Sequence, residues 1–103
     1  MCGAPAQDET LDRTLPASVD PATATIIQGR VVRDGEPVAA AYVRLLDATG
    51  EFTAEVVTSA TGDFRFFAAP GTWTLRVLAP GGVRAEQAVS AATGKIANLE
   101  VAV

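Results

Sequence analysis

The stretch ATGDFRFFAAPGTWTLR, from Ala60 to Arg76, decides the fold class of this chain. It holds two short segments in which apolar and polar residues alternate, and a period of two is typical of a β-strand. Thr61-Gly62 precedes the first segment. Pro70-Gly71 separates the two segments and predicts a type II turn, because Pro fixes φ and Gly accepts a positive φ. The stretch therefore predicts a hairpin of two antiparallel strands.

The same alternation assigns the side chains of this stretch to two faces. Those expected in the core, which needs a few large side chains, are Phe64, Phe66, Trp73 and Leu75. Arg65, Phe67 and Arg76 are expected to point outward on neighbouring strands. Because Arg and aromatic residues are over-represented in interface hot spots, these three residues are the candidate partner surface. The alternative is a solvated sheet face on which Arg stems cover apolar surface.

Alternation continues on both sides of this stretch, interrupted by turn-forming pairs that contain Gly or Pro. Strands are expected over residues 25–32, 41–46, 52–58, 64–67, 73–78, 83–89 and 96–103. Within the first strand, Gly29 indicates a bulge or close packing rather than a ligand contact. Short strands with turns every 8–12 residues favour an all-β fold, a seven-stranded Greek-key β-sandwich.

Charge divides the chain of 103 residues into two parts. The net charge is −4, and residues 1–22 carry four acids against one base, a balance of −3. Residues 23–103 carry eight acids and seven bases, a balance of −1. We therefore expect an acidic N-terminal tail over 1–22 and a single β-sandwich domain over 23–103. An acidic chain is poorly suited to nucleic acid or anionic membrane surfaces, because phosphate binding rests on clustered Lys and Arg.

The composition also excludes several kinds of chemistry. The chain has no His and a single cysteine, Cys2, so it offers neither a His general base nor the ligands of a usual Cys/His zinc site. No metal or other cofactor is expected, and the chain is not expected to be an enzyme. No apolar run approaches the roughly 18 residues that a membrane span needs, and no signal peptide is visible. A cytoplasmic protein is expected.

A spaced set of residues between 27 and 82 matches a known pattern: Ile27, Gly29 and Val31; Gly35; Val43 and Leu45; Thr61, Gly62, Phe64 and Phe66; Pro70, Gly71, Trp73, Leu75 and Val77. This pattern resembles that of the carboxypeptidase regulatory-like, transthyretin-like sandwich domains. The resemblance implies the same fold.

A second resemblance covers essentially the whole chain. It rests on Met1-Cys2, on the sequence LPASVD over 15–20 and on the block from Glu51 to Arg76. These features are similar to the SseC-like proteins of actinobacteria, a small family of unknown function. The resemblance implies an association with sulfur metabolism, because those proteins look like gene neighbours of thiosulfate sulfurtransferases (rhodaneses). The leading expectation is a non-catalytic interaction or accessory module whose partner is such a sulfurtransferase.

Two alternatives stay open. Removal of Met1 would leave Cys2 beside a free α-amino group, which lowers the pKa of the thiol when the amine is protonated. Cys2 is therefore the candidate sulfur acceptor of a sulfur-carrier protein, in which it would hold the sulfur as a persulfide. The competing interpretation is that Cys2 is an inert exposed thiol. The other alternative is a structural oligomerisation domain, a homodimer formed by pairing of exposed edge strands.

Overall fold

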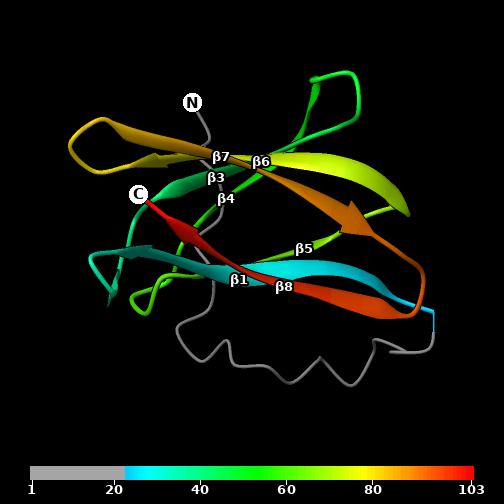
Figure 1. Ribbon diagram of the computed structural model, residues 1–103, viewed down its shortest axis with the longest axis horizontal. Coiled ribbons are helices and arrows are strands. Elements are labelled where there is room, and N and C mark those ends of the chain that lie inside the picture. Colours follow the sequence, from blue (N-terminus) through cyan, green and yellow to red (C-terminus); the bar gives the residue numbers. More distant parts are fainter. Residues whose placement is uncertain (1–22) are drawn as a thin grey trace.

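A computed structural model describes residues 23–103, which fold into two β-sheets packed face to face (Figure 1). The expected all-β class is confirmed, and the described residues contain no helix. There are eight strands instead of the expected seven, because a two-residue strand precedes the second expected one. The strands are β1 (Thr25–Arg33), β2 (Glu36–Pro37), β3 (Tyr42–Leu46), β4 (Phe52–Val57), β5 (Asp63–Phe67), β6 (Gly71–Ala79), β7 (Val83–Ala91) and β8 (Lys95–Ala102).

The first sheet is built around β1. One edge of β1 pairs with β8, which runs parallel to it from Thr25↔Lys95 to Val32↔Ala102. The other edge pairs antiparallel with β5 and, further along, with the short β2. The second sheet is wholly antiparallel, in the order β4-β3-β6-β7. Strands from the beginning and the end of the described chain thus lie side by side in the first sheet.

The expected hairpin at Pro70-Gly71 is wrong. β5 pairs with β1 in the first sheet, whereas β6 pairs with β3 and β7 in the second. Pro70-Gly71 therefore carries the chain from one sheet to the other. Gly71 has a φ of 146°, a value that side chains with a Cβ rarely adopt, which explains the glycine. The alternation of two segments defines their faces, but it does not distinguish a hairpin from a crossover between sheets.

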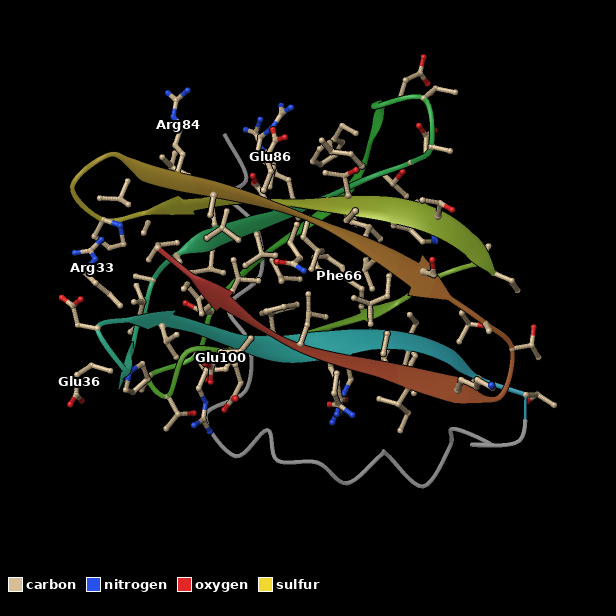
Figure 2. The ribbon with its side chains drawn as sticks, in the orientation of Figure 1. Arg33, Glu36, Phe66, Arg84, Glu86 and Glu100 are labelled. Carbon is tan, nitrogen blue, oxygen red and sulfur yellow. The ribbon has the colours of Figure 1, made fainter. Side chains whose placement is uncertain are left out.

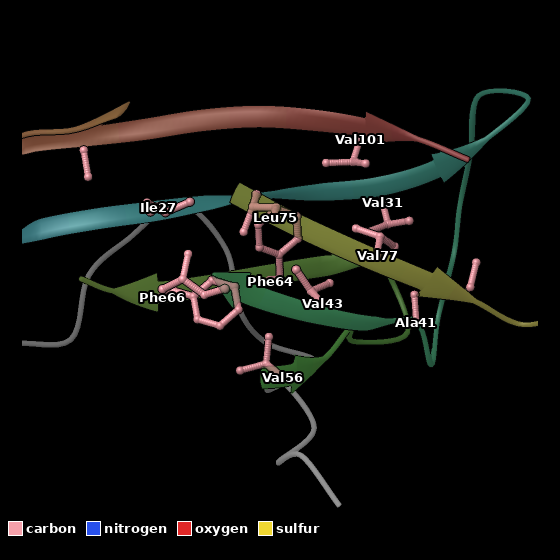
Figure 3. Close-up of a cluster of buried hydrophobic side chains, with 13 residues drawn as sticks. Ile27, Val31, Ala41, Val43, Val56, Phe64, Phe66, Leu75, Val77 and Val101 are labelled. Carbon is pink, nitrogen blue, oxygen red and sulfur yellow. The ribbon is translucent and has the colours of Figure 1, made fainter. Parts of the chain in front are cut away.

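The core lies between the two sheets and contains side chains from all of the longer strands (Figure 3). Phe64 and Phe66 are buried as expected, with ring centroids 6.2 Å apart. Leu75 is also fully buried. Trp73 is only half-buried at the margin of the core, and its Nε1 donates a hydrogen bond to the carbonyl oxygen of Ala69 at 2.9 Å.

Gly29 lies where the backbones of β1 and β8 and a core ring come together. A Cβ at this position would overlap the carbonyl oxygen of Leu99 and would lie 2.9 Å from its carbonyl carbon and 3.2 Å from Cζ of Phe64. The close packing expected at Gly29 is therefore present, and it is the backbone of β8 that approaches. Only glycine allows β8 to pair with β1 at its present distance.

Two polar side chains fix the loops at the ends of the sandwich. The buried hydroxyl of Thr58 accepts a hydrogen bond from the backbone N–H of Ala41 at 2.9 Å and donates one to the carbonyl of Val38 at 2.7 Å. Asp47 Oδ1 accepts hydrogen bonds from the backbone N–H groups of Thr49 and Glu51. Hydrogen bonds from Thr49 and Glu51 lower the pKa of Asp47. Asp47 thus has the turn-stabilising role typical of Asp in loops.

Candidate interaction surfaces

The outer face of the first sheet is closed at its centre. Ile26 is 0%, Gln28 4% and Arg65 8% exposed, although all three point away from the side of the sheet that carries Phe64 and Phe66. Arg65 Nε donates to Gln28 Oε1 at 2.8 Å, and Gln28 Nε2 donates to Asn98 Oδ1 at 3.0 Å. A polar row thus crosses β5, β1 and β8, and Arg65 is one of its buried members.

The three residues of the candidate partner surface do not come together. Arg65 and Phe67 lie on β5 in the first sheet, where Phe67 is 56% exposed, and Arg76 lies on β6 in the second sheet. The outward direction of Arg65 was predicted correctly, but its exposure was not. Alternation indicates which face a side chain takes, whereas burial depends on what covers that face.

A row of charged side chains crosses all four strands of the second sheet on its outer face. The register places Arg44 on β3 opposite both Glu55 on β4 and Arg76 on β6, and Arg76 opposite Glu86 on β7. Arg44 Nε lies 2.6 Å from Glu55 Oε2, and Arg76 Nε lies 2.7 Å from Glu86 Oε2. Directly opposed like charges are unfavourable in a sheet, and here each arginine is offset by its own glutamate.

A second row lies two residues further along the same face. It contains Tyr42, which is 43% exposed, next to Leu78, which is 40% exposed, and Arg84 opposite Leu78 on β7. Together with Arg44, Arg76 and Glu55, these residues line a depression of about 470 Å³. We call this surface the ladder face and define it by Tyr42, Arg44, Glu55, Arg76, Leu78 and Arg84.

Arg84 is the cation of the ladder face that has no ion-pair partner within residues 23–103. Figure 2 shows Arg84 and Glu86 projecting from β7 away from the interior, on the side of the sheet opposite Phe66. The exposed ring of Phe52 lies on the side of Arg44 that is away from Tyr42 and Leu78. Its centroid is 5.9 Å from the guanidinium carbon of Arg44. Together with the neighbouring Phe52, the ladder face thus presents aromatic rings and guanidinium groups, the residue types that interfaces favour.

The pairing of Arg44 with Arg76 was not predicted. They are 32 positions apart and meet only because β3 pairs with β6. No local pattern carries that information. Arg30 lies on the first sheet and forms an ion pair with Asp63 at 3.4 Å.

Cys2, the candidate sulfur acceptor, lies outside the described residues, as does the expected tail over 1–22. Among residues 23–103, no three His, Cys, Asp or Glu side chains lie close enough together to hold a metal ion. In the same part of the chain, no helix has the length and apolar character needed to cross a membrane.

Comparison with protein families gives a match over residues 2–103 to the family described as "Protein of unknown function (DUF1416)". The chain belongs to this family. Two similar proteins are the uncharacterized proteins Rv0814c and Rv3118 of Mycobacterium tuberculosis, each 63% identical over 83 residues, which is 80% of this chain and 79% of each relative. An uncharacterized protein of Mycolicibacterium smegmatis is 64% identical over 69 residues, covering 66% of this chain and 77% of that protein.

Solved structures with a similar fold also exist. The dioxygenase domain of a dioxygenase carbohydrate-binding protein fusion from Streptomyces sp. SirexAA-E matches with a TM-score of 0.62 and 11% identity, over 98% of this chain and 89% of that one. Catechol 1,2-dioxygenase from Pseudomonas arvilla C-1 matches with a TM-score of 0.55 and 19% identity, over 85% of this chain and 41% of that one. At these identities the likeness of these two proteins to the DUF1416 chain concerns the fold alone.

Proposed function

We propose that this protein is a non-catalytic interaction module that binds a partner protein through the ladder face. The observation that carries the proposal is the arrangement of Arg44, Arg76 and Arg84 around the exposed Tyr42 and Leu78. Arg and Tyr dominate binding energy at interfaces when they are desolvated in the centre of a contact. The partner segment that fits this face carries carboxylates for the arginines and an apolar side chain for the depression.

The first partner to test is a thiosulfate sulfurtransferase, acting in the cytoplasm. This choice rests on the resemblance of the chain to the SseC-like proteins. The transthyretin-like, Greek-key assignment of the sandwich is part of the proposal as well, and it rests on the residue pattern between 27 and 82 and on the spacing of the turns. The role proposed is that of an accessory protein in sulfur metabolism, which positions or regulates the enzyme without taking part in its reaction.

The experiment is a calorimetric titration of a purified actinobacterial thiosulfate sulfurtransferase with the full chain and with the double variant Tyr42→Ala/Arg76→Glu. We expect the double variant to weaken binding by roughly tenfold or more, as loss of hot-spot residues does. The matched control is Arg30→Glu, which removes a half-buried ion-paired arginine from the other sheet and is expected to change the affinity less than twofold. Absence of binding by the wild-type chain would reject this partner, and equal weakening by the control would reject this face.

The sulfur-carrier alternative depends on Cys2 and is tested separately. Incubation with thiosulfate and a rhodanese is expected to add the mass of one sulfur atom to the chain, and Cys2→Ser is expected to abolish that addition. An unchanged intact mass would remove the alternative. The third alternative, an oligomerisation domain, is favoured by the length of the edge strand β7.

A further inference from the structure

One edge of β7 has no partner strand among the described residues. All nine residues of β7 pair with β6 along its other edge, from Val83↔Ala79 to Ala91↔Gly71, without a register shift. The strand contains neither Pro nor Gly, the residues that commonly interrupt pairing at sheet edges. A long, regular edge with free N–H and C=O groups is a template for another strand.

The open part of this edge is its first two-thirds. Val83, Arg84, Glu86, Gln87 and Ala88 are exposed, and Ala85 is half-buried. Towards the end of the strand Val89 is half-buried and Ala91 is buried. Beyond that point the chain turns over to the first sheet and enters β8 (Figure 1). A pairing strand therefore has access to residues 83–88.

The charges on this open segment are complementary to those of a second copy. In an antiparallel pair, the side chains of directly opposed residues point to the same face of the sheet. Because side chains alternate along a strand, two identical strands related by a twofold axis satisfy this only when the axis passes through a residue position. An axis at Arg84 or at Glu86 sets like charges directly opposite each other, which is unfavourable. An axis at Ala85 places Arg84 of each copy opposite Glu86 of the other, which gives two pairs of opposite charge. This axis also lies near the centre of the open segment.

We propose that two copies of this chain pair antiparallel along β7, with the twofold axis at Ala85, to form a continuous eight-stranded sheet. Arg84, which has no ion-pair partner within residues 23–103, gains one in the second copy. The charged row that begins at Glu55 and ends at Glu86 then continues across the interface. The proposal uses the edge of β7 and does not depend on a partner for the ladder face.

The mass of the full chain in solution tests the dimer. Sedimentation or light scattering in reducing buffer, which excludes dimers linked through Cys2, is expected to show twice the chain mass of 10.6 kDa. Arg84→Glu and Glu86→Arg are each expected to raise the dissociation constant by roughly tenfold or more, and the double swap to restore it, because two cross-strand pairs change sign together. Arg30→Glu is the matched control and is expected to leave the dimer unchanged. A monomer at every concentration, or a dimer insensitive to these swaps, would overturn the proposal.

Cross-linking tests the register independently of any loss of affinity. In the Cys2→Ser background, Ala85→Cys places two thiols directly opposite each other, at a separation of about 4.5–5.5 Å between Cα atoms, which suits a disulfide. Mild oxidation is expected to give a covalent dimer. Ala88→Cys, on the same open segment, is expected to give little. Equal cross-linking of the two variants would reject the axis at Ala85.

Discussion

Substitution of Gly29 by alanine is expected to separate β8 from β1. The added Cβ would overlap the carbonyl group of Leu99 and press on the ring of Phe64, both of which belong to well-packed structure. Relief requires β8 to move by roughly 1 Å or more, since ordinary contacts of a Cβ begin near 3.4 Å. Overpacking of this kind costs about 1–3 kcal/mol, and loss of about two ladder hydrogen bonds adds about 1 kcal/mol each.

The expected loss is therefore about 3–5 kcal/mol, a large part of the roughly 5–15 kcal/mol that stabilises a typical domain. Urea unfolding followed by Trp73 fluorescence and far-ultraviolet circular dichroism measures it. The matched control is Gly50→Ala: Gly50 has a φ of 86° but no atom within 4 Å of a Cβ, so only about 1–2 kcal/mol of backbone strain is expected. A Gly29→Ala variant no less stable than the control would show that the close β1–β8 approach is not what requires glycine.

Three further outcomes are expected. Thr58→Val should destabilise the domain by about 2–3 kcal/mol, because a buried N–H loses its acceptor, whereas Thr58→Ser should lie within about 1 kcal/mol of wild type; equal urea midpoints for the two variants would contradict this. Gln28→Leu should cost about 2–3 kcal/mol, since it removes an acceptor from the buried guanidinium of Arg65; an unchanged midpoint would mean that this bond is not needed. The folded-state pKa of Asp47 is depressed below its usual 3.8, so its contribution to the 47–51 loop is present above that value and is lost as pH falls through the folded pKa. The protection of the Glu51 amide against hydrogen exchange, measured relative to its intrinsic exchange rate at each pH, should therefore fall in acid, and Asp47→Asn should abolish that dependence on pH.

The part of the fold that could be predicted from sequence is the part governed by local periodicity. Alternation located seven strands and assigned Phe64 and Phe66 to the core, and the glycine at position 29 indicated close packing within its strand. The additional strand, β2, was not predicted because a segment of two residues is too short to show a period.

The features that depend on which strands pair could not be predicted from the sequence. The crossover at Pro70 looked like a hairpin because a turn sequence does not specify which strands flank it. Arg65 was expected to be exposed because alternation indicates the face that a side chain takes but not whether that face is covered. The opposition of Arg44 and Arg76, the centre of the proposed partner surface, depends on the β3–β6 pairing alone. The candidate site was therefore the least predictable part of the molecule.

The parallel pairing of β1 with β8 has a consequence for the order of events during synthesis. Residues that face each other across this pair, such as Gln28 and Asn98, are 70 positions apart. The central strand β1 is thus synthesised long before β8. Until β8 is made, the edge of β1 that pairs with it stays unpaired between apolar side chains. Contacts of such long range are formed slowly. A nascent or truncated chain that lacks β8 is accordingly expected to aggregate or to engage a chaperone, and not to fold into a smaller sandwich.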